Sequence, residues 1–172
     1  MFAKGNHIVY PAHGVGLFVC SEFTEVAGQM VEFYVVEFPR DKMKLKISAS
    51  KAKSVGLRLP SSPEIISKAL ELLSKSVVRP KKIIWNRRAQ EYETKINTGE
   101  PCIIAEVIRE LAFTEQGSRS YSEKMVYQLA VERLAREMAI VESIDVDKAI
   151  ARIEHALRRP LKLQPDAQLS PI

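Results

Sequence analysis

The stretch GLRLPSSPEIISKALELL, residues 56–73, marks a change from one kind of structure to another. Its middle, RLPSSPE, contains two prolines and two serines, which is the composition of a boundary between elements. Ser62 is expected to cap a helix whose first position is Pro63 and whose first turn holds Glu64. The apolar residues that follow recur at helical spacing. The stretch therefore predicts a structural joint that opens a helix.

The residues before this joint have β character. Runs rich in Val, Phe and Tyr are separated by turn signals at 27–29 and 39–42. In MKLKI, 43–47, apolar residues alternate with Lys44 and Lys46, which predicts a half-buried strand with its lysines in water. Four short strands joined by tight turns indicate a small curled sheet or an SH3-like barrel.

The residues after the joint predict about five helices, the first of which begins at Pro63. Each of the others has a recognisable start and stop signal. These signals are a start near Trp85 and a C′ glycine at Gly99; a start at Pro101 and a stop at Gly117; a capping box formed by Ser120 and Glu123; and a cap at Asp145 with a stop at Pro160.

Strands followed by helices, without alternation, predict an α+β chain of two small domains rather than one α/β sheet. We expect a β module over residues 1–58, a linker at 59–62, a compact all-helical domain over 63–160 and a flexible tail at 161–172.

Composition places the chain in the soluble, cytoplasmic class. Apolar residues make up 46%, enough for a core, and no apolar run approaches the roughly 18 residues of a membrane helix. The N-terminus lacks the features of a signal peptide. Cys20 and Cys102 are distant in sequence and lie among apolar residues, so we expect reduced core thiols.

The sequence offers no sign of catalysis, a cofactor or a metal. His7, His13 and His155 have no Cys or acidic neighbours at ligand spacing. The GVG at 14–16 lacks the rest of a dinucleotide fingerprint and predicts a turn between strands. The carboxylates alternate with Lys and Arg on helix faces, which is typical of solvated surfaces. We therefore expect a protein that is not an enzyme.

The decapeptide RPKKIIWNRR, residues 79–88, holds the chain's only tryptophan, five basic residues and no acid. Three readings are open for Trp85: a plug in the helical core, an anchor in a protein groove, or a ring that stacks on or wedges into nucleic acid. A helix that starts near Trp85 places Trp85, Arg88 and Tyr92 near one face, and Arg87 and Glu91 on the next. It also places Arg87 and Arg88 in its first turn, where cations are disfavoured. That placement favours a partner with phosphates.

Seven motifs occur in an order that resembles the CarD/CdnL family of bacterial transcription regulators, over residues 2–157. A motif like the first also occurs in the transcription-repair coupling factor, but that helicase-bearing chain is far longer. The motifs are HIVYPAHGVG (7–16), FYVVEF (33–38), MKLKI (43–47), VGLR (55–58), WNRR (85–88), NTG (97–99) and AEVIRELA (105–112).

The resemblance implies a Tudor-like, SH3-like module that binds the β subunit of RNA polymerase, and a helical domain that contacts promoter DNA at the upstream edge of the bubble. In the family a tryptophan wedges into the distorted minor groove there and resists collapse of the bubble, without reading sequence. The regulator thereby stabilises the open complex formed with the housekeeping sigma factor.

By position, Trp85 matches the family's wedge, and Arg87 and Arg88 match the basic pair beside it. Members often carry Tyr and another base after this motif, where this chain has Ala89 and Gln90, which removes one phosphate contact. Two alternatives follow: a weaker DNA contact, or one shifted onto Lys81 and Lys82, the second expected from their charge alone.

On the polymerase side, Lys46 matches a basic residue of the binding face, and Lys44 is its neighbour on the strand. Thr24 stands where some members place a second polymerase-contacting arginine.

The resemblance thus implies two partners, RNA polymerase and promoter DNA, no membrane, and a cytoplasmic monomer that reaches the nucleoid through polymerase. A second hypothesis from the residues is a protein-interaction adaptor, in which the β module binds another protein and Trp85 is a core residue that does not touch DNA.

Overall fold

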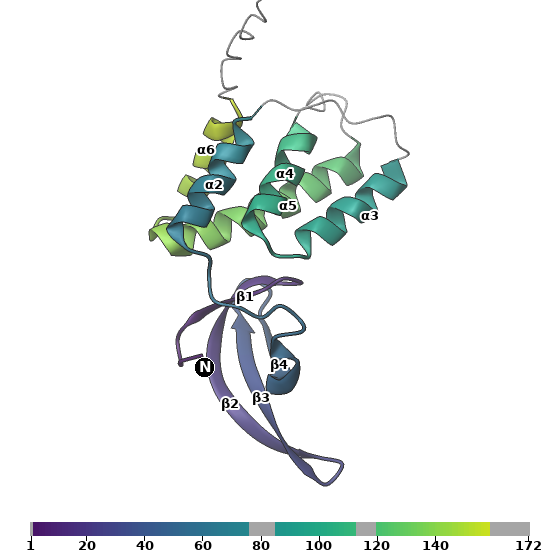
Figure 1. Cartoon of the computed structure of the whole chain (residues 1–172), viewed down its shortest axis with the longest axis vertical. Helices are drawn as coiled ribbons and strands as arrows, with labels where there is room; N and C mark the ends of the chain where they lie inside the picture. The colour runs from purple at the N-terminus through teal and green to yellow at the C-terminus, as the bar shows by residue number, and fades with distance from the viewer. Residues whose placement is uncertain (1, 76–84, 113–119, 159–172) are drawn as a thin grey trace, which may run out of the picture.

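The computed structural model describes residues 2–75, 85–112 and 120–158 (Figure 1). The first part is an antiparallel sheet of four strands in the order β1-β2-β3-β4. The strands are β1 (His7–Tyr10), β2 (Gly14–Val26), β3 (Gln29–Phe38) and β4 (Met43–Ser48). The sheet is strongly curved, and β2 and β3 continue as a long hairpin away from the helices (Figure 1). The four predicted strands and the predicted turns at 27–29 and 39–42 are confirmed. The turn predicted at 14–16 is wrong, because these residues are the first of β2 and pair with β1.

The hairpin between β2 and β3 closes with positive φ at two successive residues, 51° at Ala27 and 78° at Gly28. Two residues of this kind form the tight turn whose twist matches that of paired strands. Glycine adopts this conformation freely, whereas Ala27 adopts it against the repulsion of its own Cβ.

The inner face of the sheet carries the module's hydrophobic cluster. Phe18 faces Val36 across β2 and β3, and Val36 faces Leu45 across β3 and β4. A short helix that the sequence analysis did not predict, α1 (Ala49–Ala52), follows β4 and buries Ala52 in the cluster. The other buried members are Ile8, Phe38, Ile47 and Leu57.

The second part consists of five helices, as predicted. They are α2 (Pro63–Leu73), α3 (Trp85–Ile96), α4 (Pro101–Ala112), α5 (Tyr121–Glu142) and α6 (Val146–Leu157). Helix α5 contacts β2 and each of the other four helices, and it carries buried residues along most of its length. The helices pack around one cluster, which includes Ile66, Ile108 and Leu134.

Three predicted helix ends need correction or lie outside the described residues. Helix α3 ends at Ile96, so Gly99 is not its C′ residue. Gly99, with φ of 72°, instead turns the chain into α4 and packs against Pro11 of the β module. The stops expected at Gly117 and Pro160 fall outside the described residues.

The caps agree with the sequence in part. At α5 the capping box is complete, because Ser120 Oγ accepts from the Glu123 backbone and Glu123 Oε2 accepts from the Ser120 backbone at 2.8 Å. Ser62 and Asp145 occupy the N-cap positions of α2 and α6, but neither side chain makes a capping hydrogen bond. The predicted starts of these two helices are confirmed, but the predicted side-chain capping is wrong.

Both cysteines are free and partly buried. Cys102 packs against the helical core, and burial raises the pKa of its thiol. Cys20 pairs with Val35 on the face opposite the module's cluster, so the prediction of a core thiol is wrong for Cys20. No helix within the described ranges is long and apolar enough to cross a membrane.

A buried ion pair joins the two parts. Glu137 of α5 accepts from both terminal nitrogens of Arg58, at 2.7 and 3.0 Å, and from the backbone of Ser61 at 2.8 Å. Arg58 also donates to the carbonyl of Gly99 at 2.6 Å, and its backbone pairs with that of Val9. This junction therefore connects the β module, the segment that leaves it, the α3–α4 turn and α5.

Candidate functional site

The three residues assigned to polymerase binding lie on one face of the sheet. Residues opposite each other on paired strands, and residues two apart along a strand, project to the same side. Lys46 pairs with Val35, and Val35 pairs with Cys20. Thr24 is four residues from Cys20 on the same strand, and Lys44 is two from Lys46. The sheet therefore presents Thr24, Lys44 and Lys46 together on its outer face, opposite the hydrophobic cluster.

Both lysines of the outer face reach acidic partners. Lys46 Nζ lies 2.6 Å from a carboxylate oxygen of Glu22, and Lys44 Nζ lies 3.7 Å from one of Glu37. The hydrogen bond and the charge of Lys46 lower the pKa of Glu22. Lys46 and Lys44 are exposed, as the alternation of this strand predicted. The outer face is thus a mixed-charge surface.

The far end of the β2–β3 hairpin carries apolar side chains in water. Phe23 and Met30 are 65% and 67% exposed, and their strand positions place them on the inner side of the sheet, beyond the core. Alternation and composition predicted only strands for this segment, with no contact surface. Exposed aromatic and methionine side chains are typical of contact surfaces between proteins.

At the other candidate surface, α3 begins at Trp85 and its first turn holds no acid. Trp85 is partly buried and packs against the helical core, with its ring centroid 6.3 Å from that of Tyr92. Arg88 donates to the Tyr92 hydroxyl at 2.6 Å, and its guanidinium lies 5.5 Å from the ring centroid. Burial raises the pKa of Tyr92, and the hydrogen bond from Arg88 opposes the shift. Trp85, Arg88 and Tyr92 therefore form one aromatic and cationic cluster.

Arg87 lies on the adjacent face of α3, with its side chain 80% exposed and 3.7 Å from Glu91. The sequence placed Arg87 beside Glu91 and Trp85 beside Arg88 and Tyr92, and both groupings are confirmed. Two cations in the first turn of a helix oppose its dipole by about 0.3–1 kcal/mol each. The pair with Glu91 offsets part of this for Arg87.

The position of Trp85 is intermediate between a core residue and an exposed one. Its contact with the core agrees with the plug, and its partial exposure leaves ring area for a partner. Lys81 and Lys82, the other cations assigned to DNA, lie outside the described residues. Of the residues that the sequence predicted to contact DNA, the structure therefore describes Trp85, Arg87 and Arg88.

The junction residues were missed by sequence reasoning. VGLR is one of the motifs of the family resemblance, but the sequence predicted no role for its Arg58. A signal existed in α5, because helical spacing places Glu137 on the same side as the buried Leu134 and Ala130. A carboxylate at a core position requires a buried cation. Within the described ranges, no group of three or more His, Cys, Asp and Glu residues is arranged to hold a metal ion.

Comparison with known proteins accounts for both parts of the chain. Residues 2–59 match the CarD-like/TRCF RID domain, and residues 68–154 match the CarD C-terminal domain. A Bacillus subtilis protein named "Putative transcription factor YdeB" is 29% identical over 145 residues, which cover 84% of this chain and 94% of that protein.

Proposed function

The chain belongs to the CarD family and is a transcription regulator of the kind that interacts with RNA polymerase; from this premise we propose that it stabilises the open promoter complex by joining polymerase to promoter DNA. The β module would bind the β subunit, and the helical domain would contact DNA at the upstream edge of the bubble. Regulators of this family are not enzymes, and we assign the chain no catalytic role.

The outer face of the sheet supports the assignment on the polymerase side. Thr24, Lys44 and Lys46 share it, and each lysine can exchange an intramolecular carboxylate for one on the partner. Charged pairs of this exposed kind contribute to orientation and association rate more than to affinity. We therefore expect apolar contacts on the same module to supply the rest of the binding free energy.

The observation that carries the proposal on the DNA side is the Trp85–Tyr92–Arg88 cluster at the start of α3. Packing of Trp85 on Tyr92 and the core holds the indole in place, so little rotational freedom is lost when a base step meets it. Arg87, exposed at the same helix end, can exchange its ion pair with Glu91 for a phosphate. An indole that enters a step costs a few kcal/mol of unstacking in closed duplex, and far less where strands already separate.

Two modest contacts suffice because they are linked. Once the β module is bound to polymerase, the helical domain meets DNA at a high effective concentration. A formal net charge of only +5 agrees with DNA binding that depends on this tether.

The lifetime of the open complex after competitor challenge tests the wedge. Trp85→Ala and Trp85→Leu should both shorten it at least about fivefold, since stacking on one base contributes about 1–3 kcal/mol. Trp85→Leu keeps apolar packing against Tyr92, and circular dichroism checks that both variants fold. A folded Trp85→Leu variant with a wild-type lifetime would remove the wedge from the proposal.

Lys46→Glu tests the polymerase side. It places a second carboxylate beside Glu22 and reverses the charge offered to the β subunit, so we expect binding to weaken about tenfold. Lys53→Glu, an exposed lysine after α1, is the matched control. Equal binding of the β subunit by both variants would exclude the outer face as the contact.

The contact of Trp85 with the core also supports the adaptor hypothesis, in which the β module binds protein and the helical domain does not touch DNA. Crosslinking separates the two. A photoreactive group at position 85 labels promoter DNA in the polymerase complex under the main proposal and labels only protein under the adaptor hypothesis.

A further inference from the structure

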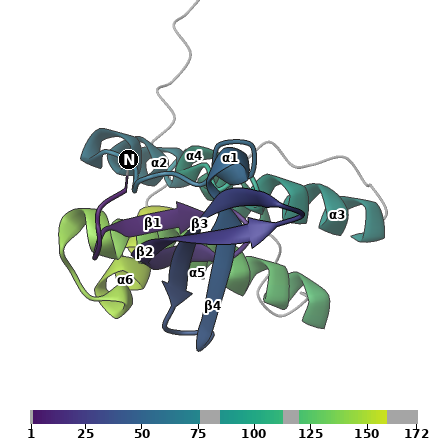
Figure 2. The same cartoon turned by 90° about the horizontal axis from the view of Figure 1, so that it is seen from below.

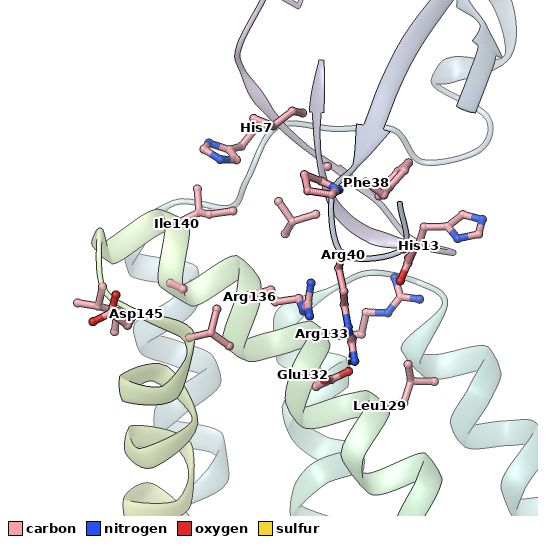
Figure 3. A pocket seen from close by; sticks show the side chains of 18 residues that line it. His7, His13, Phe38, Arg40, Leu129, Glu132, Arg133, Arg136, Ile140 and Asp145 are labelled. Carbon is pink, nitrogen blue, oxygen red and sulfur yellow. Dashed lines mark hydrogen bonds and ion pairs between the residues drawn. The ribbon is translucent and has the colours of Figure 1, made fainter. Parts of the chain in front are cut away.

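A groove of about 520 Å³ opens where the β module meets the helical domain (Figure 3). Both parts line it, with His7, His13 and Arg40 on one side and Arg133 and Arg136 of α5 on the other. Binding sites for small molecules are often found between domains and have about this volume.

Three arginines converge on this groove, and two of them are already engaged. Arg40 forms an ion pair with Glu132, drawn as a dashed line in Figure 3. Arg133 donates to the carbonyl of Pro11 at 3.2 Å and to that of Ala12 at 2.5 Å.

Arg136 is different. Its Nε is buried without a hydrogen-bond partner, and no described residue forms an ion pair with its guanidinium. Arg136 as a whole is only partly buried, so its terminal nitrogens, which are donors as well, remain available to an acceptor in the groove. Arg136 points into the groove between Arg40 and Ile140 (Figure 3).

Charged side chains of both signs surround Arg133 in the groove. Burial lowers the pKa of Arg133, and the charges of Arg136 and Arg40 lower it further, while Asp41 and Glu132 oppose them. Asp145 also lines the groove, but it lies 3.5 Å from Lys148 on α6. Counted with Arg133 itself, these groups are three arginines and two carboxylates, so one positive charge is in excess.

The rest of the lining is largely apolar, which limits what could occupy the groove. A highly charged ligand would lose its hydration against aliphatic side chains, and a single unpaired cation would not offset that cost. A ligand with one anionic group and an apolar body avoids that loss. The apolar lining includes Leu17, Leu129, Ile140, Ile144 and Val146.

We propose that this groove binds a small amphipathic anion, with a single carboxylate or phosphate group on Arg136 and an apolar body along the α5–α6 side. Because its walls come from both domains, an occupant contacts both and stabilises their arrangement by mass action. This is a ligand site additional to the polymerase and DNA contacts, and it does not depend on them.

Titration calorimetry on the whole chain tests the site with three probes of equal chain length: octanoate, octyl phosphate and octanol. We expect at least one anion to bind and octanol to bind at least about tenfold more weakly, since a charge-assisted hydrogen bond contributes about 1.5–3 kcal/mol. The stronger of the two anions identifies the head group.

Arg136→Met should weaken the anion about tenfold or more, and Arg158→Met, an exposed arginine at the end of α6, should leave it unchanged. Arg136→Lys keeps the charge and should retain part of the affinity if Arg136→Met fails to fold. The proposal is overturned by octanol binding as well as the anions, by equal binding to the Arg136 variants and wild type, or by no anion binding at millimolar concentration.

Discussion

Removing the carboxylate of Glu137 should loosen the junction between the two domains. Its side chain is 3% exposed, and it satisfies two nitrogens of Arg58 and the backbone of Ser61. In Glu137→Ala, Arg58, whose side chain is 25% exposed, keeps only its bonds to the carbonyls of Gly99 and Leu59.

The expected loss follows from those contacts. Breaking a buried pair by removing one partner costs about 3–5 kcal/mol, because the remaining charge stays buried. Arg58 retains two carbonyl acceptors and some water, so the lower end applies, and we expect the free energy of unfolding to fall by about 3 kcal/mol.

Urea unfolding followed by fluorescence and circular dichroism measures this loss. The fluorescence of Trp85, the only tryptophan in the chain, reports on the helical domain, while circular dichroism reports on both parts. Glu132→Ala is the control, since it removes a second ion pair between the domains, that with Arg40, whose side chains are 33% and 52% exposed. An exposed pair contributes about 0.2–1 kcal/mol.

A double-mutant cycle with Arg58→Met separates the pair from the packing around it. We expect a coupling free energy of about 2 kcal/mol between positions 58 and 137. Additivity within about 0.5 kcal/mol, or a Glu137→Ala variant no less stable than Glu132→Ala, would show that the junction does not depend on this pair.

Arg87→Ala should weaken DNA binding by the helical domain, and the number of counterions released on binding should fall by about one. Arg158→Ala is the control, because Arg158 is equally exposed at 80% and is also paired with a residue four positions away; it should change neither quantity. Filter binding over a series of salt concentrations measures both. The pKa of Glu22 should lie below 4.5 and rise in a Lys46→Gln variant, as read by NMR titration. Because the folded pKa is the lower one, the pair's stabilisation is present above the unfolded pKa and fades as pH falls through the folded value; an unshifted Glu22 would contradict the contact. Ser120→Ala should destabilise α5 by about 1 kcal/mol in thermal unfolding, and a change below about 0.3 kcal/mol would show that the capping box is dispensable.

The spacing of apolar residues, together with turn and capping residues, was enough to predict most of the fold. Alternation around Lys44 and Lys46 predicted a strand and its exposed side, and the box at Ser120 predicted both a helix and its hydrogen bonds. Local signals of this type depend on residues a few positions apart, so they can be recognised from a single sequence. The failures are also informative: α1 is too short to show a helical period, and Gly99 is used for contact with Pro11 rather than as a cap.

The candidate sites were predicted less completely because they depend on distant residues. Helical spacing alone grouped Trp85 with Arg88 and Tyr92. The arrangement of Thr24 with Lys46 required the strand register, and the groove at Arg136 required the docking of two domains. No spacing within α5 indicates that Arg136 lacks a partner, because its surroundings come from the β module.

The junction also has a consequence for the order in which the chain assembles during synthesis. Arg58 and Glu137 are 79 positions apart, whereas each pair of neighbouring strands in the β module is consecutive along the chain. Contacts between nearby residues form early and at little entropic cost, and domains fold as units from the N-terminal end. We therefore expect the β module to complete its cluster while Arg58 is still hydrated, and the two parts to dock only after α5 has left the ribosome. The ion pair of Glu137 with Arg58 would then form last, when the helical domain docks on the β module.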